Sequence, residues 1–186
     1  MIELDPERRE AVLSAAMATF ERYGYRRTSM ETLAEAADMS RPALYQYFRN
    51  KEAVFREMAQ WALEANAATA VAAAEQACTP GAGIEAILNA VLDLHGRADS
   101  EYSFEFLDDV LARAADLWQW YEERILDALA EQLRSATTGS KRSSADVADL
   151  AAVLFYGTKG ISLSPRSATR RREYVAVLAA AVISKP

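Results

Sequence analysis

Cysteine and histidine are nearly absent from this sequence of 186 residues, which has one of each, Cys78 and His95. A single cysteine excludes an internal disulfide, and together the two residues offer too few soft ligands for a typical zinc site. We therefore expect a reducing, cytoplasmic setting, with no metal and no cofactor. The N-terminal residues are acidic and lack the apolar core of an export signal, which agrees with that location.

Long apolar runs, glycine and proline are also scarce. No stretch reaches the roughly 18 uninterrupted apolar residues that a membrane-spanning helix needs. Even the alanine-rich segment 62–77 is broken by polar side chains. The chain has 7 glycines and 5 prolines against 51% hydrophobic residues, a composition that favours helices over strands. The sequence therefore predicts an all-α protein, with about nine helices by its periodicity.

Positive charge is in deficit over the whole chain, whose net charge is −6, but not everywhere along it. Between Arg22 and Lys51, six basic residues stand against three acidic ones. A local excess of positive charge matters for nucleic acids, because phosphates respond to charge within about one Debye length, ~8–10 Å. This segment is therefore the candidate for a DNA contact.

Helix signals recur along the chain. A first helix is expected from Pro6 to Gly24, short helices over 28–37 and 41–48, and a long helix from 51 to about 77 that Asn50 can cap. A breaker follows at residues 79–83. The later apolar periodicity predicts five more helices, over residues 84–92, roughly 104–115, 117–133, about 145–161 and 169–184.

The two short helices and the tight turn between them form a predicted helix-turn-helix, whose second helix can enter a DNA major groove. Thr28 with Glu31 fits a capping box, and Ser40 can cap the second helix. Leu44 and Phe48, four residues apart, would face inward. The groups left outward, which can read base edges or hold phosphates, are Arg41, Ala43, Gln46 and Tyr47. Taken alone, such a motif could also serve protein contacts or simply pack.

The segment 24–52 resembles the N-terminal domain of the TetR family of repressors. The matching positions are Thr28, Leu33-Ala34, Ser40, Leu44-Tyr45, Phe48 and Lys51-Glu52. The resemblance covers about the first 57 residues, and the remainder is similar in length and helicity alone. Where the family usually has glycine in the turn, this chain has Asp38, a residue that tolerates the left-handed conformation better than most.

The resemblance implies a homodimer that binds a near-palindromic operator and is released by a small molecule. It implies a DNA-binding domain over residues 1–50 and a ligand-sensing and dimerisation domain over residues 51–186. Thr28, Tyr47 and Lys51 would contact phosphates, and Tyr45 would either lie beside the bases or pack against the scaffold. The implied DNA-binding residues are Thr28, Ser40, Arg41, Pro42, Ala43, Tyr45, Gln46, Tyr47 and Lys51.

Aromatic residues are dense in the middle of the predicted C-terminal domain, where they could form an ordinary core or line a pocket. Interhelical gaps lined by such rings and a few polar groups are common ligand sites. We predict an apolar or aromatic effector anchored by Tyr121 and His95, although a lone histidine also fits a core or surface position. The predicted lining comprises His95, Phe104, Phe106, Leu117, Trp118, Tyr121 and Phe155.

Apolar stripes on the last two predicted helices must be buried, and two such helices from each chain would form a four-helix interface. Gly157 and Gly160 indicate a close helix approach at that interface or a kink. The predicted dimer contacts are Val147, Leu150, Leu154 and Ile161 on one helix and Tyr174, Val175, Leu178 and Val182 on the other.

Two rival classes remain. An enzyme is disfavoured because the sequence has no metal-type Glu-x-x-His, no nucleophile elbow and no phosphate loop, so no catalytic residues are predicted. The alternative is a helical small-molecule-binding or scaffold protein without DNA-binding activity. The predicted function is a ligand-responsive, DNA-binding transcriptional repressor, with duplex DNA, a small molecule and a second copy of the chain as partners.

Overall fold

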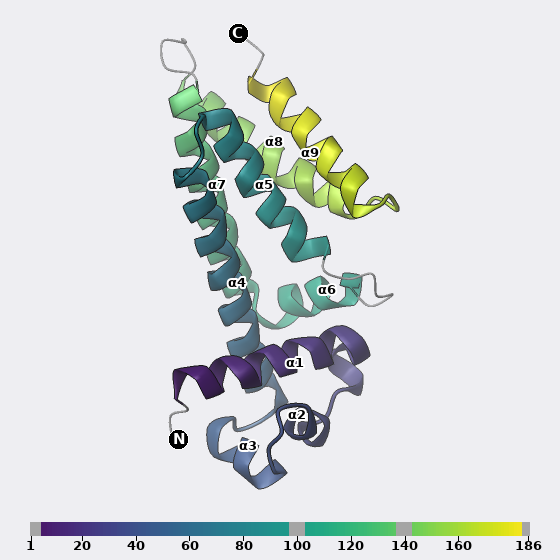
Figure 1. Cartoon of the computed structure of the whole chain (residues 1–186). Coiled ribbons are helices and arrows are strands. Elements are labelled where there is room, and N and C mark those ends of the chain that lie inside the picture. The colour runs from purple at the N-terminus through teal and green to yellow at the C-terminus, as the bar shows by residue number, and fades with distance from the viewer. Residues whose placement is uncertain (1–4, 97–102, 137–142, 184–186) are drawn as a thin grey trace. The chain divides into compact units, whose positions relative to one another are not determined.

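The structure is a computed structural model that describes residues 5–96, 103–136 and 143–183, with backbone alone at 95–96, 103–107 and 183. Within these ranges the chain forms nine α-helices and no strand, which confirms the predicted all-α class (Figure 1). None of the described helices is long and apolar enough to cross a membrane.

The helices group into two compact units, each with its own core. The first comprises residues 1–63 and 98–118, and the second comprises residues 64–97 and 119–186. These units are defined by how the helices pack. The predicted division into a DNA-binding domain, 1–50, and a ligand-sensing domain, 51–186, is defined by function and stays a prediction.

The first unit contains α1 (Pro6–Arg27), α2 (Met30–Ala36), α3 (Arg41–Tyr47), the beginning of α4 (Lys51–Glu75) and α6 (Ser103–Arg113). The helix α1 packs on both α2 and α6, and α2 packs on α3. Apolar side chains with the helical spacing of the sequence meet in the middle of this unit. The fully buried ones include Leu13, Phe20, Leu33, Leu44 and Phe55.

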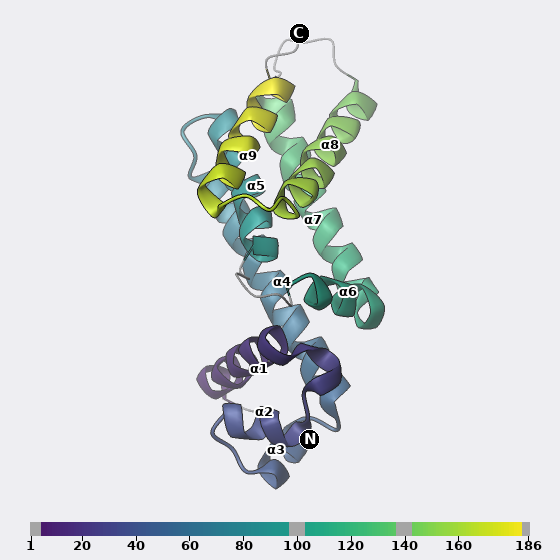
Figure 2. The same ribbon diagram turned by 90° about the vertical axis from the view of Figure 1, so that its right-hand side faces the viewer.

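The second unit contains α5 (Pro80–Gly96), most of α7 (Ala115–Ala136), α8 (Ser144–Ser162) and α9 (Ala168–Ile183), together with the end of α4. The helices α8 and α9 pack against each other and against α5 (Figure 2). Fully buried residues of this core include Ile84, Leu88, Ile125, Leu129 and Phe155.

One predicted boundary is wrong, at the segment read as a breaker. The helix α5 begins at Pro80 rather than at Ile84, so both glycines of the segment lie in its first turn. The reason is local: the Thr79 hydroxyl accepts a hydrogen bond from the Ala82 amide at 3.2 Å. Proline is also favoured in a first helical turn, where its missing N–H costs nothing.

Candidate DNA-binding surface

The first helix is interrupted near its C-terminal end by Gly24, whose φ of 73° lies in the left-handed region that glycine adopts without strain. The chain then makes one more turn and enters α2 through Thr28 and Ser29. The predicted capping box is wrong by one residue: the Ser29 side chain accepts from the Thr32 amide at 3.1 Å. The Thr28 hydroxyl instead donates back to the Gly24 carbonyl at 2.8 Å and is buried.

The turn between α2 and α3 has the left-handed residue that a helix-turn-helix needs. Asp38 has a φ of 50°, which confirms that an aspartate can take the place of the usual glycine here. The Arg8 guanidinium on α1 donates to the carbonyls of Ala37 at 3.3 Å and Asp38 at 3.0 Å. Arg8 thus holds the turn, a role that no sequence motif indicated.

The second helix of the motif, α3, begins as predicted, with the Ser40 hydroxyl accepting from the Ala43 amide at 3.3 Å. Leu44 and Phe48 are buried beneath it and fix its orientation. The outward side chains form what we call the α3 face. Its exposed members are Arg41, Pro42, Tyr45 and Gln46, with Ala43 and Tyr47 half-buried at its edge.

Tyr45, whose placement the sequence left open, is 42% exposed and belongs to the α3 face. The Arg41 guanidinium carbon lies 5.7 Å from the centroid of its ring. A cation near an aromatic ring at this distance is attracted to it electrostatically. The pair therefore presents a planar donor group backed by an aromatic ring at the N-terminal end of α3, the end that contacts base edges in such motifs.

Lys51 is the first residue of α4, and its half-buried side chain is bonded to backbone of the same unit. The amine donates to the carbonyls of Tyr25 at 2.7 Å and Thr28 at 2.8 Å. Burial, and secondarily the charge of Arg113, lowers the pKa of Lys51 below its usual value. Asn50 caps α4 as predicted, accepting from the Ala53 amide at 2.8 Å. The N-terminus of α4 therefore offers backbone amides to an anion, whereas the Lys51 ammonium is bonded to the backbone at the end of α1 and just after it.

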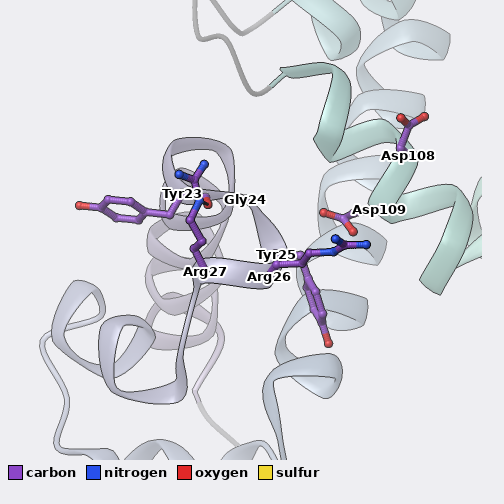
Figure 3. Close-up of a pocket in the computed structure, with 7 residues that line it drawn as sticks. All are labelled: Tyr23, Gly24, Tyr25, Arg26, Arg27, Asp108 and Asp109. Atoms are coloured by element: carbon purple, nitrogen blue, oxygen red, sulfur yellow. Dashed lines mark hydrogen bonds between the residues drawn. The ribbon is translucent and has the colours of Figure 1, made fainter.

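A hollow of about 460 Å³ lies beside Tyr25, at the end of α1 (Figure 3). Two arginines and two aspartates meet around it: Arg26 and Arg27 come from the end of α1, and Asp108 and Asp109 from α6. Its full lining is Tyr23, Gly24, Tyr25, Arg26, Arg27, Asp108 and Asp109. No sequence motif indicated that Tyr25 and α6 belong to this region, because residues so distant along the chain show no shared pattern.

The predicted pocket residues fall in different places. Leu117 and Trp118 belong to the first unit, whereas Tyr121 and Phe155 are fully buried in the second. The Tyr121 hydroxyl donates to the Asn66 side-chain oxygen at 2.7 Å, and burial raises the pKa of Tyr121. The side chains of His95, Phe104 and Phe106 lie outside the described residues.

The predicted dimer residues divide by exposure. Four of them are buried within the chain's own second unit, where they pack between α5, α8 and α9: Val147, Leu154, Val175 and Val182. The other four are half-buried: Leu150, Ile161, Tyr174 and Leu178. Gly157 explains one close approach, because a Cβ at this position would lie 2.9 Å from a Leu178 methyl carbon of the same chain.

Comparisons with known proteins agree with this geometry. Residues 12–58 match the family described as bacterial regulatory proteins, tetR family. The transcriptional regulator YhgD of Bacillus subtilis is 35% identical over 52 residues, which cover 28% of this chain and 27% of YhgD. The regulator RutR of Escherichia coli K12 is 42% identical over 48 residues, 26% of this chain and 23% of RutR. The chain thus spans about a quarter of the length of these relatives.

Solved structures share the fold over nearly the whole chain. Escherichia coli NemR in its reduced form has a TM-score of 0.77 at 16% identity, covering 96% of this chain and 99% of NemR. A tetR-family regulator from Mesorhizobium loti has a TM-score of 0.72 at 20% identity, covering 96% of both chains. Residues 12–58, which contain the helix-turn-helix, are therefore similar to the tetR family of bacterial regulatory proteins, and the fold of the chain is similar to that of solved tetR-family regulators.

Proposed function

We propose that this protein is a ligand-responsive repressor that binds a near-palindromic DNA operator as a homodimer. The observation that carries the proposal is the α3 face, where Arg41, Tyr45 and Gln46 point outward from a helix that Leu44 and Phe48 hold in place. A guanidinium and an amide can each make paired hydrogen bonds to base edges in a major groove. A regulator of this kind acts on the chromosome, in the cytoplasm.

Phosphate contacts would flank the base contacts. The sequence predicted a phosphate contact at Thr28, but Thr28 is buried, so we assign this contact to the exposed hydroxyl of Ser29 next to it. Tyr47 lies at the edge of the α3 face. The first amides of α4 have the orientation and partial positive charge that bind anions at helix N-termini. We assign the phosphate contact at Lys51 to its backbone amide, because its ammonium is engaged by two carbonyls.

Selection of bound duplexes from a random pool tests this function directly. We expect one enriched sequence with two-fold symmetry. In Arg41→Ala, the preference at one position of each half-site should relax, at ~1–3 kcal/mol if the arginine makes a paired base contact. Arg49→Ala is the matched control, since Arg49 is an exposed arginine just after α3. It removes the same charge and should leave the selected sequence unchanged.

Failure to enrich any duplex would contradict the proposal and favour the alternative, a helical small-molecule-binding or scaffold protein. Enrichment that is identical for the wild type and Arg41→Ala would instead move the base contacts away from the N-terminal end of α3.

The proposed homodimer uses the exposed side of α8 and α9. Each of its four large apolar residues is at least half exposed in the single chain: Val153, Tyr156, Leu163 and Val177. Gly160 is exposed on the same helix, and a Cβ there would meet no atom within 4 Å outside its chain neighbours and the nearby backbone of α8, so this part of α8 leaves room for a partner helix. Burying such a surface against a second copy would remove it from water.

The proposed effector site lies in the second unit. Tyr121 and Phe155 supply rings there, and Thr158 Oγ1 and Asn89 Oδ1 are buried atoms without a hydrogen-bond partner in the structure. Buried polar atoms are normally satisfied, so a ligand donor at either position is reasonable. We therefore propose a mainly apolar effector with at least one hydrogen-bonding group. Two solved proteins of this fold are named as regulators of fatty acid degradation and of fatty acid metabolism.

Such an effector would release DNA only by binding the DNA-incompetent state more tightly than the competent one. A hundredfold difference in affinity would supply about 2.7 kcal/mol. Thermal-shift screening with long-chain and aromatic compounds, followed by operator release, would identify the class. Binding that persists unchanged in Phe155→Ala and Thr158→Val would contradict this location.

A further inference from the structure

The Tyr25 ring has a cation near it from each of two helices. The Lys51 ammonium of α4 lies 4.3 Å from the ring centroid, and the Arg113 guanidinium carbon of α6 lies 3.7 Å from it. The ring also packs on Phe20 and edge-on against Phe55, with centroids 5.8 and 5.3 Å away. We call Tyr25, Lys51 and Arg113 the Tyr25 cluster. It joins α1, the beginning of α4 and α6, and all three of its residues lie within the first unit.

The Tyr25 cluster sits at both ends of the helix-turn-helix. Tyr25 and Thr28 belong to the last turn of α1 and the connection into α2, and Lys51 opens α4 shortly after α3 ends. Because the Lys51 ammonium donates to the carbonyls of both Tyr25 and Thr28, it links the segment that precedes the helix-turn-helix to the helix that follows it. The distance between the connection into α2 and the beginning of α4 therefore affects the position of α3 and of the first amides of α4.

Arg113 is itself held in place. Its Nε donates to the Asp109 carboxylate at 3.2 Å, one turn earlier on α6. Its carbonyl accepts from the Arg56 guanidinium of α4 at 2.9 Å, and the same guanidinium makes two bonds to the Asp116 carboxylate, at 3.0 and 2.7 Å. These bonds fix the end of α6 to α4, and the Arg113 side chain at this end contacts the Tyr25 ring.

We propose that Arg113 is a positioning residue for DNA binding, which acts through Tyr25 and Lys51 to hold the two ends of the helix-turn-helix at their working distance. This inference rests on the proposed DNA-binding function. A planar guanidinium stacks on an aromatic face better than an ammonium or an apolar chain does. Loss of Arg113 would free one face of Tyr25, loosen the carbonyls that Lys51 grips, and increase the range of positions open to α3.

The test compares operator affinity in paired variants of the full chain. Arg113→Met and Tyr25→Leu should each weaken binding by about fivefold to tenfold, and the double variant by no more than the stronger single one, because both break one contact. Arg113→Lys and Tyr25→Phe keep the cation and the ring, so they should stay within about twofold to threefold of the wild type. The salt dependence of binding should not change, because Arg113 touches no phosphate.

Arg124→Met is the matched control for lost charge. Arg124 is an exposed arginine on α7, in the second unit, and its replacement should leave operator affinity within about twofold of wild type. The second readout is the Lys51 pKa, followed by NMR of the labelled lysine side chain without DNA. It should rise in Arg113→Met, since a nearby positive charge has been removed, and stay unchanged in Arg124→Met.

Each failure has its own signature. A wild type that binds no selected duplex overturns the proposed function, and the positioning role falls with it. A wild type that binds while Arg113→Met binds equally well overturns the positioning role alone. Equal losses in Arg113→Met and Arg113→Lys, with no change in the Lys51 pKa, would also overturn it, since they would indicate general destabilisation.

Discussion

Asp38 alone among the described non-glycine residues has a positive φ, at 50°. The left-handed conformation costs most side chains about 1–2 kcal/mol, and aspartate less. We therefore expect Asp38→Ala to lower the free energy of unfolding by about 1 kcal/mol, and Asp38→Gly to leave it within about 0.5 kcal/mol of wild type. The Arg8 bonds are to backbone carbonyls, so both variants keep them. Urea denaturation measures the difference.

Glu35→Ala is the control for this residue, because Glu35 is exposed on the neighbouring helix α2. Alanine is favourable in a helix, so this change should not lower stability. If Asp38→Ala and Asp38→Gly unfold at the same urea concentration, the turn does not depend on a left-handed residue at this position.

At the scale of elements, a chain of hydrogen bonds joins three helices of the second unit. The Tyr121 hydroxyl of α7 donates to the Asn66 side chain of α4, which in turn donates to the Ala90 carbonyl of α5 at 2.9 Å. Tyr121→Phe leaves the Asn66 oxygen without this donor. We expect a loss of about 1–2 kcal/mol in the free energy of unfolding, since the fully buried Tyr121 ring leaves the oxygen of the half-buried Asn66 facing an apolar side chain, and an unsatisfied polar group costs more than the bond itself contributes.

Tyr156→Phe is the control for Tyr121. The Tyr156 hydroxyl also donates to a side chain, the Glu122 carboxylate, but Tyr156 is half exposed in the single chain, so water can replace the bond when unfolding is measured at concentrations too low for the proposed dimer to form. Its removal should change stability by less than about 0.5 kcal/mol. Equal effects of the two substitutions, measured by thermal unfolding, would mean that the helix-linking bond contributes no more than a surface one.

For the whole molecule, the proposed interface predicts how assembly responds to charge. Val177 is 68% exposed on α9, so Val177→Glu removes little packing within the chain but places a carboxylate in the proposed interface. We expect monomers at micromolar concentration by sedimentation, and much weaker operator binding because half-sites are no longer engaged together. The same change at Leu154 would be uninformative, because that residue is fully buried.

Leu111→Glu provides the comparison, because Leu111 is 41% exposed on α6, away from α8 and α9 along the chain. It adds the same charge and should leave the oligomeric state unchanged. Dimers of Val177→Glu at the same concentration would move the interface to another surface.

The sequence by itself determined what depends on local spacing. Apolar residues at helical intervals and capping side chains at Ser40 and Asn50 predicted the helices around the motif, because these interactions span only a few residues. The outward placement of Arg41 and Gln46 followed from the burial of Leu44 and Phe48 one turn apart. Because a helix has a single periodicity, the residues on its buried side determine which residues lie on its exposed side.

Only the tertiary structure decided how distant segments meet. The pairing of Tyr25 with Arg113, and the grip of Arg8 on the turn, join residues that share no local pattern. The same limit explains the dimer stripes: periodicity identified Leu154 and Val175 as residues that must be buried, but not which helix would cover them. Within one chain α5, α8 and α9 do so, and the exposed side of α8 and α9, with Val153 and Val177, is left for a partner. Burial is a property of packed pairs of helices, whereas periodicity belongs to one helix alone.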